Sequence, residues 1–336
     1  MSSGLLLSCS SESVGPDGNP YAFENPSNFP KAVYTFENNS VTQDGFELGR
    51  ALFYDPILSI DSSVSCANCH QQALAFTDPV HRLSKGVNER EGTRNALAIQ
   101  NMAFQSNFFW DGGVKHLDFV PINAITSDVE MAEKLVHVVE KLARSKTYPQ
   151  KFNKAFGSTE VDSQRMLFAL SQFMNLMISS NSKYDKYVRS EGAILSNDEM
   201  EGLKLFQVKC GSCHATDLFT DGSFRNNGLD SAFEKDAGRE IITESSEDRG
   251  KFKVPSLRNA ELTSPYMHDG RFKNLKQVLD HYSKDVKESE TLDPLLRQGS
   301  SLGISLSEEE KVKIISFIKT LTDKTFTQDK RFSSPF

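Results

Sequence analysis

Apolar residues recur every three or four positions in four long stretches of the chain, which predicts amphipathic helices. Three of these stretches open with Ser-x-x-Glu, the capping box in which each of the two side chains accepts the other residue's backbone N–H. Few stretches alternate with period two, so we expect a mainly α fold. The predicted helices are 127–145 (Ser127/Glu130), 162–180, 196–206 (Ser196/Glu199) and 307–323 (Ser307/Glu310).

A Gly-x-x-Leu-Phe pattern at helical spacing occurs twice, from Gly49 to Phe53 and from Gly202 to Phe206. Each copy precedes a Cys-x-x-Cys-His motif, and repetition on this scale predicts two related domains. We place the domains at residues 28–188 and 189–304 and expect 305–336 to be a C-terminal helix and tail that pack back on them.

Composition and charge narrow the class of protein. The 336 residues are 38% hydrophobic and 25% charged, as in an ordinary globular protein large enough to bury a core. The net charge of -7, with no long basic block, excludes the clustered Lys/Arg face that nucleic-acid binding uses. No run of about 18 apolar residues occurs, so we expect no membrane-spanning helix.

The first residues, MSSGLLLSCSSES, look like the end of a bacterial lipoprotein signal, with Cys9 as the residue that receives the lipid. No basic segment precedes them, and the apolar stretch is shorter than the usual ~7–15 residues, so a truncated start and an incidental thiol remain alternatives. Ser, Pro, Gly and Asn dominate residues 10–30. We therefore predict a leader and flexible tether over residues 1–27.

Four of the five cysteines belong to two copies of Cys-x-x-Cys-His. A zinc ribbon normally has its knuckles about 15–20 residues apart, and a redox dithiol needs no histidine after it. Cys-x-x-Cys-His is the attachment signal for c-type haem, so we expect two covalent haems in an exported protein and keep zinc or a disulfide as alternatives. The motifs are Cys66, Cys69 and His70, then Cys210, Cys213 and His214.

With these motifs, the chain resembles the bacterial di-haem cytochrome c peroxidases, a family that includes the MauG-type enzymes, which oxidise tryptophans of a partner protein. The resemblance runs from about Gly45 to Asp323 and implies two cytochrome c-like haem domains with long loops. Its landmarks are SCANCH (65–70), GTRNALAIQNMAFQSNFFWDGG (92–113), KCGSCH (209–214) and FKVPSLRNAELTSPYMHDGRF (252–272).

The resemblance assigns roles to two further residues. Trp110, the only tryptophan, falls where the family keeps a tryptophan between the haems, and a π-system there can relay electrons. Glu130 falls at the family's distal glutamate, which moves a proton between the peroxide oxygens. The alternatives are a packing residue for Trp110 and a helix cap for Glu130.

At the first haem the chain departs from many relatives. A histidine that blocks the resting haem in those relatives is replaced by Val87, and His81 lies too early in the chain, so we expect it at the surface. The first haem should therefore have an open sixth site at rest. Val120 replaces the family's distal glutamine, so Glu130 carries more of the hydrogen bonding to peroxide.

At the second haem the family methionine ligand, counted from His268, is replaced by Tyr282. MauG-type enzymes place tyrosine there, and a phenolate should lower the reduction potential. The alternative ligands are Met267, His268 and His281. The resemblance also implies a calcium site made by Asn95 with the carbonyls of Thr263 and Pro265.

These observations predict a periplasmic di-haem peroxidase, with a lipid anchor at Cys9 as an open alternative. Hydrogen peroxide would react at the first haem, and electrons from a small c-type cytochrome would enter through the second haem and cross by way of Trp110. Two alternatives are a MauG-like oxidase of a partner-protein residue or small phenol, and a di-haem electron carrier without peroxide chemistry. The sequence leaves the oligomeric state open, and relatives often form homodimers.

Overall fold

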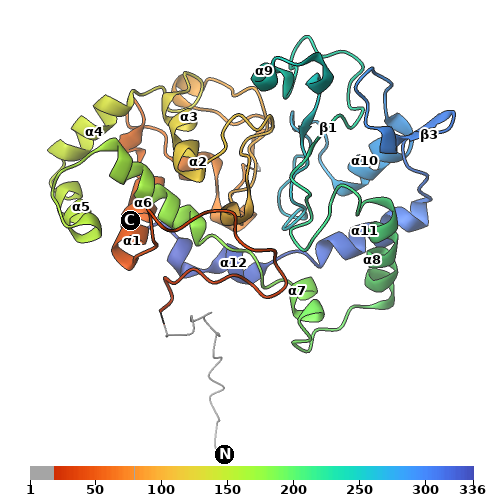
Figure 1. Cartoon of the computed structure of the whole chain (residues 1–336), viewed down its shortest axis with the longest axis horizontal. Coiled ribbons are helices and arrows are strands. Elements are labelled where there is room, and N and C mark those ends of the chain that lie inside the picture. Colours follow the sequence, from red (N-terminus) through yellow and green to blue (C-terminus); the bar gives the residue numbers. More distant parts are fainter. Residues whose placement is uncertain (1–18, 79) are drawn as a thin grey trace, which may run out of the picture.

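The computed structural model describes residues 19–78 and 80–336, and Cys9 lies outside them. The described chain is mainly helical and forms two lobes side by side (Figure 1). The first lobe contains α1 (Gln43–Tyr54), α2 (Cys66–Cys69), α3 (Val120–Thr126), α4 (Leu135–Arg144), α5 (Tyr148–Phe156) and α6 (Ser163–Asn175).

The second lobe is reached through α7 (Lys183–Val188), and its two short antiparallel sheets pair β1 with β2 and β3 with β4. Among the described residues, none of the helices has the length and apolar character needed to cross a bilayer. The remaining elements are α8 (Asn197–Lys209), β1 (Phe224–Arg225), α9 (Glu240–Thr243), β2 (Phe252–Lys253), α10 (Leu275–Asp280), β3 (Arg297–Gln298), β4 (Ser301–Leu302), α11 (Glu308–Lys319) and α12 (Lys324–Gln328).

Each lobe has its own hydrophobic core, and the two cores are built on equivalent helix pairs. In the first, α1 packs on α6, where a Cβ on Gly49 would overlap the carbonyl of Ala169. In the second, α8 packs on α11, where a Cβ on Gly202 would overlap the carbonyl of Lys313. The repeated glycine thus allows two helix backbones to approach closely, which explains the Gly-x-x-Leu-Phe repeat.

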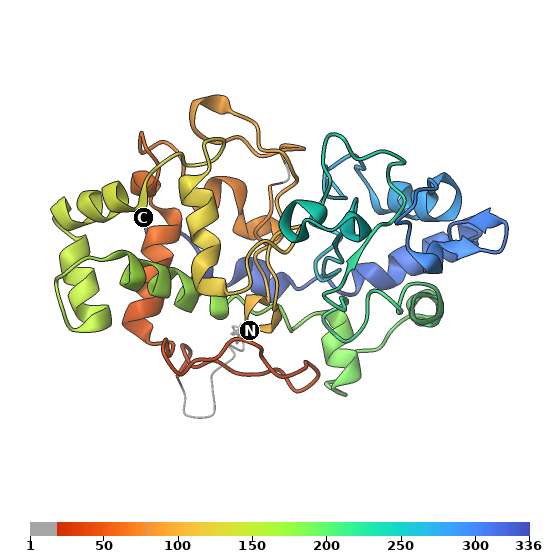
Figure 2. The same ribbon diagram turned by 45° about the horizontal axis from the view of Figure 1, so that its top comes forward.

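Both ends of the described chain belong to the first lobe. Phe326 and Phe332, from α12 and the residues after it, are buried in the first core, and the C-terminus lies beside α1 (Figure 2). Residues 19–27 also pack there, because the Tyr21 ring contacts Phe46 and the Phe23 ring contacts Phe36. The packed chain therefore begins before the predicted boundary at residue 28.

Two of the three predicted capping boxes are present, at Ser196/Glu199 and Ser307/Glu310. The prediction of a helix from Ser127 is wrong, because Ser127 ends α3 and α4 starts only at Leu135. The N–H of Met131 donates to Ala124 O at 3.1 Å, so the intervening residues fold back on α3 as a turn. Met131 is buried in the first core, and this packing favours the turn over the helix that the Ser127/Glu130 capping box predicts.

We predict that Gly49→Ala and Gly202→Ala each lower the free energy of unfolding by about 1–3 kcal/mol, because a methyl group forces the helix pair apart. Lys204→Ala, at an exposed position of α8, is the control and should leave stability within about 0.5 kcal/mol. Thermal and denaturant unfolding of the holoprotein measure both effects. Unchanged melting of both glycine variants would contradict the close approach.

Candidate haem centres

The first Cys-x-x-Cys-His motif forms a single helical turn, α2, followed directly by His70. The His70 Nδ1–H donates to the carbonyl of Phe76 at 2.9 Å, which leaves Nε2 as the free coordinating nitrogen. Burial lowers the pKa of His70, so the imidazole stays neutral, as metal ligation requires. Burial also raises the pKa of the Cys66 thiol to about 12.

The second motif repeats this local geometry. The His214 Nδ1–H donates to the carbonyl of Phe219 at 3.0 Å, and burial lowers the pKa of His214. The four cysteines of the two motifs are free thiols, which rules out a disulfide among the described residues. Two thiols and one oriented neutral imidazole in each lobe fit a covalently attached c-type haem.

Glu130 lies in the turn between α3 and α4, close to the first motif. Its negative charge contributes to the raised pKa of both Cys66 and Cys69, which places the carboxylate near the two thiols. The side chain keeps contact with solvent, yet the protein around it is dense enough for desolvation to raise the pKa of Glu130. The Ser127 hydroxyl opposes this effect by hydrogen bonding to the carboxylate.

The loop that lacks the family histidine is closed against this turn. The Val87 N–H donates to the Glu130 carbonyl at 2.8 Å, and Val87 is buried. A Cβ on Gly86 would overlap the backbone of Val129 and Glu130, so glycine is needed for this approach. His81 is 40% exposed and binds Asp78 through a 3.1 Å Nδ1–Oδ2 contact, as expected for a surface histidine.

Trp110 lies where the two lobes meet. Its indole N–H donates to the carbonyl of Asn95 at 2.8 Å, and its own carbonyl accepts the Lys253 N–H at 2.7 Å. The indole meets the His268 ring edge-on, with centroids 6.4 Å apart, and His268 stacks on Phe252 at 3.6 Å. The aromatic group is therefore held by segments from both halves of the chain.

Beside the second motif, Tyr282 and Met267 lie close together. The Asn227 Nδ2 is 3.5 Å from the Tyr282 hydroxyl and 3.5 Å from the Met267 sulfur, so the two candidate ligands are at most twice that distance apart. Burial raises the pKa of Tyr282 to about 12, and the charges of Cys213 and Cys210 add to this. Tyr282 lies just after the end of α10, in the π-helical turn His281–Asp285.

The two histidine alternatives have other partners. His281 is buried, and its Nε2–H donates to the carbonyl of Asn227 at 3.0 Å. His268 stacks on Phe252 and meets the edge of Trp110. The bond to Asn227 occupies one ring nitrogen of His281, whereas Tyr282 lies close to the cysteines of the second motif.

Asn95 is buried against the loop that carries the other predicted calcium ligands. Its backbone N–H donates to the carbonyl of His268 at 2.7 Å, and its Nδ2 donates to the carbonyl of Arg82 at 3.1 Å. Thr263 and Pro265 precede His268 in the same loop. An amide oxygen with two backbone carbonyls is a donor set that suits calcium.

The structure contains an ion pair between Arg94 and Asp236, at the junction of the two lobes, that the sequence did not predict. The Arg94 guanidinium binds Asp236 through two parallel contacts of 2.7 and 2.8 Å and also binds Asp111. Arg94 belongs to a quoted landmark, but Asp236 lies in a polar loop without any distinguishing pattern. This ion pair connects the backbone next to Asn95 in the first lobe to the loop around Asp236 in the second lobe.

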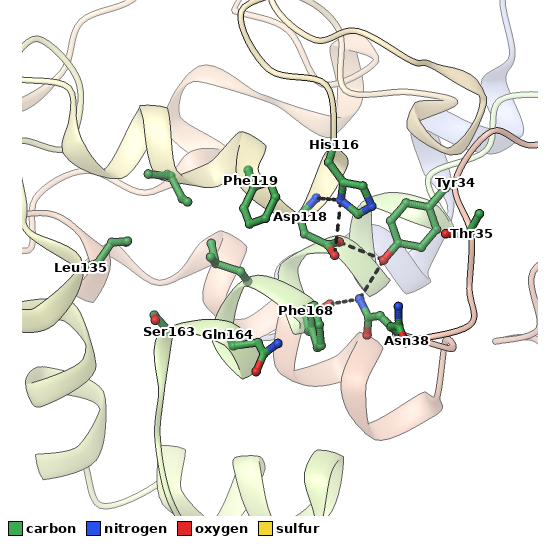
Figure 3. Close-up of a pocket in the computed structure, with 13 residues that line it drawn as sticks. Tyr34, Thr35, Asn38, His116, Asp118, Phe119, Leu135, Ser163, Gln164 and Phe168 are labelled. Carbon is green, nitrogen blue, oxygen red and sulfur yellow. Dashed lines mark hydrogen bonds and ion pairs between the residues drawn. The ribbon is translucent and has the colours of Figure 1, made fainter.

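A separate pocket of about 460 Å³ lies between the N-terminal segment (residues 34–39), α3 and α6 (Figure 3). The Tyr34 hydroxyl donates to Asp118 Oδ1 at 2.9 Å and accepts the Asn39 amide at 3.0 Å. None of the predicted site residues lines this pocket. The Tyr34–Asp118 bond attaches the N-terminal segment to the residues that lead into α3.

Comparison with known proteins decides the family. Residues 43–193 match the family described as di-haem cytochrome c peroxidase. The methylamine utilization protein MauG of Methylorubrum extorquens is 32% identical over 295 residues, which cover 87% of this chain and 82% of that protein. This chain belongs to the di-haem cytochrome c peroxidase family.

Two further matches agree with this family assignment. The cytochrome c551 peroxidase of Nitrosomonas europaea is 34% identical, over 83% of this chain and 80% of that protein. A crystal structure of a MauG-like protein associated with microbial copper homeostasis superposes with a TM-score of 0.84 at 30% identity, covering 93% of this chain and 99% of that one. The di-haem family has two c-type haems as its cofactors, which matches the two oriented motifs.

We predict that Cys66→Ala/Cys69→Ala lowers the haem content from two haems per chain to one, because one pair of thioether bonds can no longer form. Cys210→Ala/Cys213→Ala should have the same effect on the other haem. The haem-to-protein ratio of denatured, chromatographed protein measures this, with Cys9→Ala as a control that keeps both haems. Two covalent haems in either double variant would contradict the assignment.

Proposed function

We propose that this di-haem protein reduces hydrogen peroxide to water at the haem attached through Cys66 and Cys69. One peroxide takes up two electrons and two protons and yields two water molecules. The haem iron would supply the redox chemistry, and His70 would be the residue of this chain that holds it. The observation that carries the proposal is the closed loop at Val87, which brings Glu130, and no histidine, to the vicinity of the first motif.

Glu130 is proposed as the residue that moves the proton. Its carboxylate accepts a proton from one peroxide oxygen and returns it to the other, which becomes water. A general base works best when its pKa approaches the working pH, and desolvation raises the pKa of Glu130 in that direction. Valine stands at position 120, where the resemblance implies the family's distal glutamine, and Val87 beside Glu130 is also apolar, so Glu130 would carry the polar contact with peroxide.

Trp110 is proposed as the electron relay between the two haems. The indole is nine-tenths buried and donates to the carbonyl of Asn95 in the first lobe, while the backbone carbonyl of Trp110 accepts the N–H of Lys253 from the second lobe. Cys210, Cys213 and His214 would hold the second haem, through which electrons would enter. The external donor is proposed to be a small c-type cytochrome.

A second candidate function is a MauG-like oxidase, and one observation favours it. Tyr282 lies beside the second motif, where its phenolate would stabilise oxidised iron and lower the potential. A low ferric/ferrous potential would make a cytochrome a poor donor to this haem. The two electrons that peroxide takes up would then come from a residue of a partner protein or from a small phenol, which would be oxidised. A simple electron carrier is disfavoured, because carriers keep both axial positions filled and the Val87 loop brings no ligand to the first haem.

Two further proposals rest on the resemblance, a calcium site and a homodimer, and two rest on other features of the sequence. One calcium ion would be held by Asn95 and the carbonyls of Thr263 and Pro265, where it would join the first lobe to the 263–268 loop. Covalent haem attachment favours work in the periplasm, and the lipoprotein-like pattern around Cys9 favours a lipid anchor there. A homodimer is proposed as its assembly state.

We predict that Glu130→Gln lowers the rate of peroxide reduction about 10²–10⁴-fold while both haems remain attached. The pH profile provides a second test. Because the carboxylate is the active form and its pKa is raised, the wild-type rate should fall on acidification at a higher pH than an ordinary glutamate would give. Glu130→Gln should lose this acidic limb.

Asp128→Asn, which changes an exposed carboxylate in the same turn, is the matched control for Glu130→Gln. It should keep the wild-type rate and pH profile. An active Glu130→Gln variant with an unchanged acidic limb would show that another group moves the proton.

We predict that Tyr282→Met raises the reduction potential of one haem, because a neutral thioether replaces an anionic donor. Met267→Leu should leave both potentials unchanged. Potentiometric titration of the holoprotein, followed by the absorbance of each haem, makes the comparison. If Met267→Leu shifts a potential and Tyr282→Phe does not, Met267 is the ligand and Tyr282 is a neighbouring side chain.

A further inference from the structure

Lys253 is a buried cation without an acidic partner among residues 19–78 and 80–336. It is 8% exposed, and its ammonium donates to Gln105 Oε1 at 2.8 Å and to the carbonyl of Asn107 at 3.0 Å. Both acceptors are neutral, and an ammonium has a third N–H to donate. Burial alone lowers the pKa of Lys253 to about 8, with no opposing carboxylate.

Other buried cations of this protein are paired with acids. Lys311, which is also buried, binds Asp280 and Glu308 at 2.6 and 2.8 Å. The fully buried Arg258 makes two contacts with Asp185, at 2.7 and 2.9 Å. Burial of an unpaired charge is unfavourable, so Lys253 differs from the other buried cations in the described part of the chain.

The position of Lys253 indicates what its partner is. Its backbone N–H binds the Trp110 carbonyl at 2.7 Å, and its side chain reaches residues 105–107 of the first lobe. Two residues later in the chain, the backbone of Pro255 contacts the imidazole of His214. Lys253 therefore lies at the junction between the lobes, on a segment that passes the second haem motif.

Each c-type haem brings two propionate carboxylates, which need hydrogen-bond donors and positive charge wherever they enter the protein. The neighbouring cation Arg94 is already bound by Asp236 and Asp111. We propose that Lys253 is the ammonium partner of a haem propionate at the junction of the two lobes. This inference rests on the two haems of the family and is independent of peroxide chemistry.

A pairing of this kind has a measurable effect on the haem. A positive charge close to the porphyrin stabilises the ferrous state, which carries one positive charge fewer than the ferric state. Lys253 therefore raises the reduction potential of the haem that it contacts, and the propionate in turn keeps Lys253 protonated in its buried position.

The test compares Lys253→Met, Lys253→Arg and Lys251→Met holoproteins by spectroelectrochemistry and redox-induced infrared difference spectra. Lys253→Met should lower the reduced-to-oxidised ratio of at least one haem about tenfold at a fixed potential, which corresponds to 59 mV for one electron. It should also shift the carboxylate bands of the propionates. Lys253→Arg should stay near the wild type in both measurements.

Lys251→Met is the matched control, because Lys251 lies two residues away and is bound to Asp248 at 3.3 Å. It should leave the potentials and the carboxylate bands unchanged. The proposal is overturned if Lys253→Met leaves both potentials at their wild-type values, or if a potential shifts while the carboxylate bands stay fixed. Absence of peroxide turnover in the wild type would refute the proposed activity and leave this pairing intact.

Discussion

An imidazole that binds iron through Nε2 needs its other nitrogen held in place, and a backbone carbonyl does this in both lobes of the protein. His70 is bonded to Phe76 and His214 to Phe219, six and five residues downstream. The bond selects the tautomer and the orientation of the ring. Each carbonyl belongs to a loop that follows its motif directly, so the residues near each motif fix the orientation of the proposed iron ligand in both lobes.

The two helix pairs that support these motifs also form a repeat. Gly49 and Gly202 let α1 and α8 approach α6 and α11 so closely that side chains are excluded at the contact. In the second lobe α8 ends at Lys209, next to Cys210, whereas in the first lobe residues 55–65 separate α1 from Cys66. The repeated glycines explain why the two lobes contain similar helix pairs. They do not explain the contacts at the junction, to which the two lobes contribute different residues.

Local patterns in the sequence predicted the helical class, the haem motifs, the glycine repeat and the capping boxes at Ser196 and Ser307. The same rule failed at Ser127, because packing of Met131 decides the path of the chain there. Contacts across the junction could not be predicted in this way. Asp236 lies 142 residues from its partner Arg94. Only the assembled fold reveals that Lys253 has no acidic partner within the residues that the structure describes.

We propose that the first haem offers an open coordination site, because the loop at Val87 supplies no histidine. Cyanide titration of the fully oxidised holoprotein, without prior reduction, tests this proposal. We expect one equivalent of cyanide to bind per chain and to be lost from the Cys66→Ala/Cys69→Ala variant. Binding that requires reduction, or no binding at all, would mean that another side chain fills the site, and the account of peroxide reduction at this haem would be wrong.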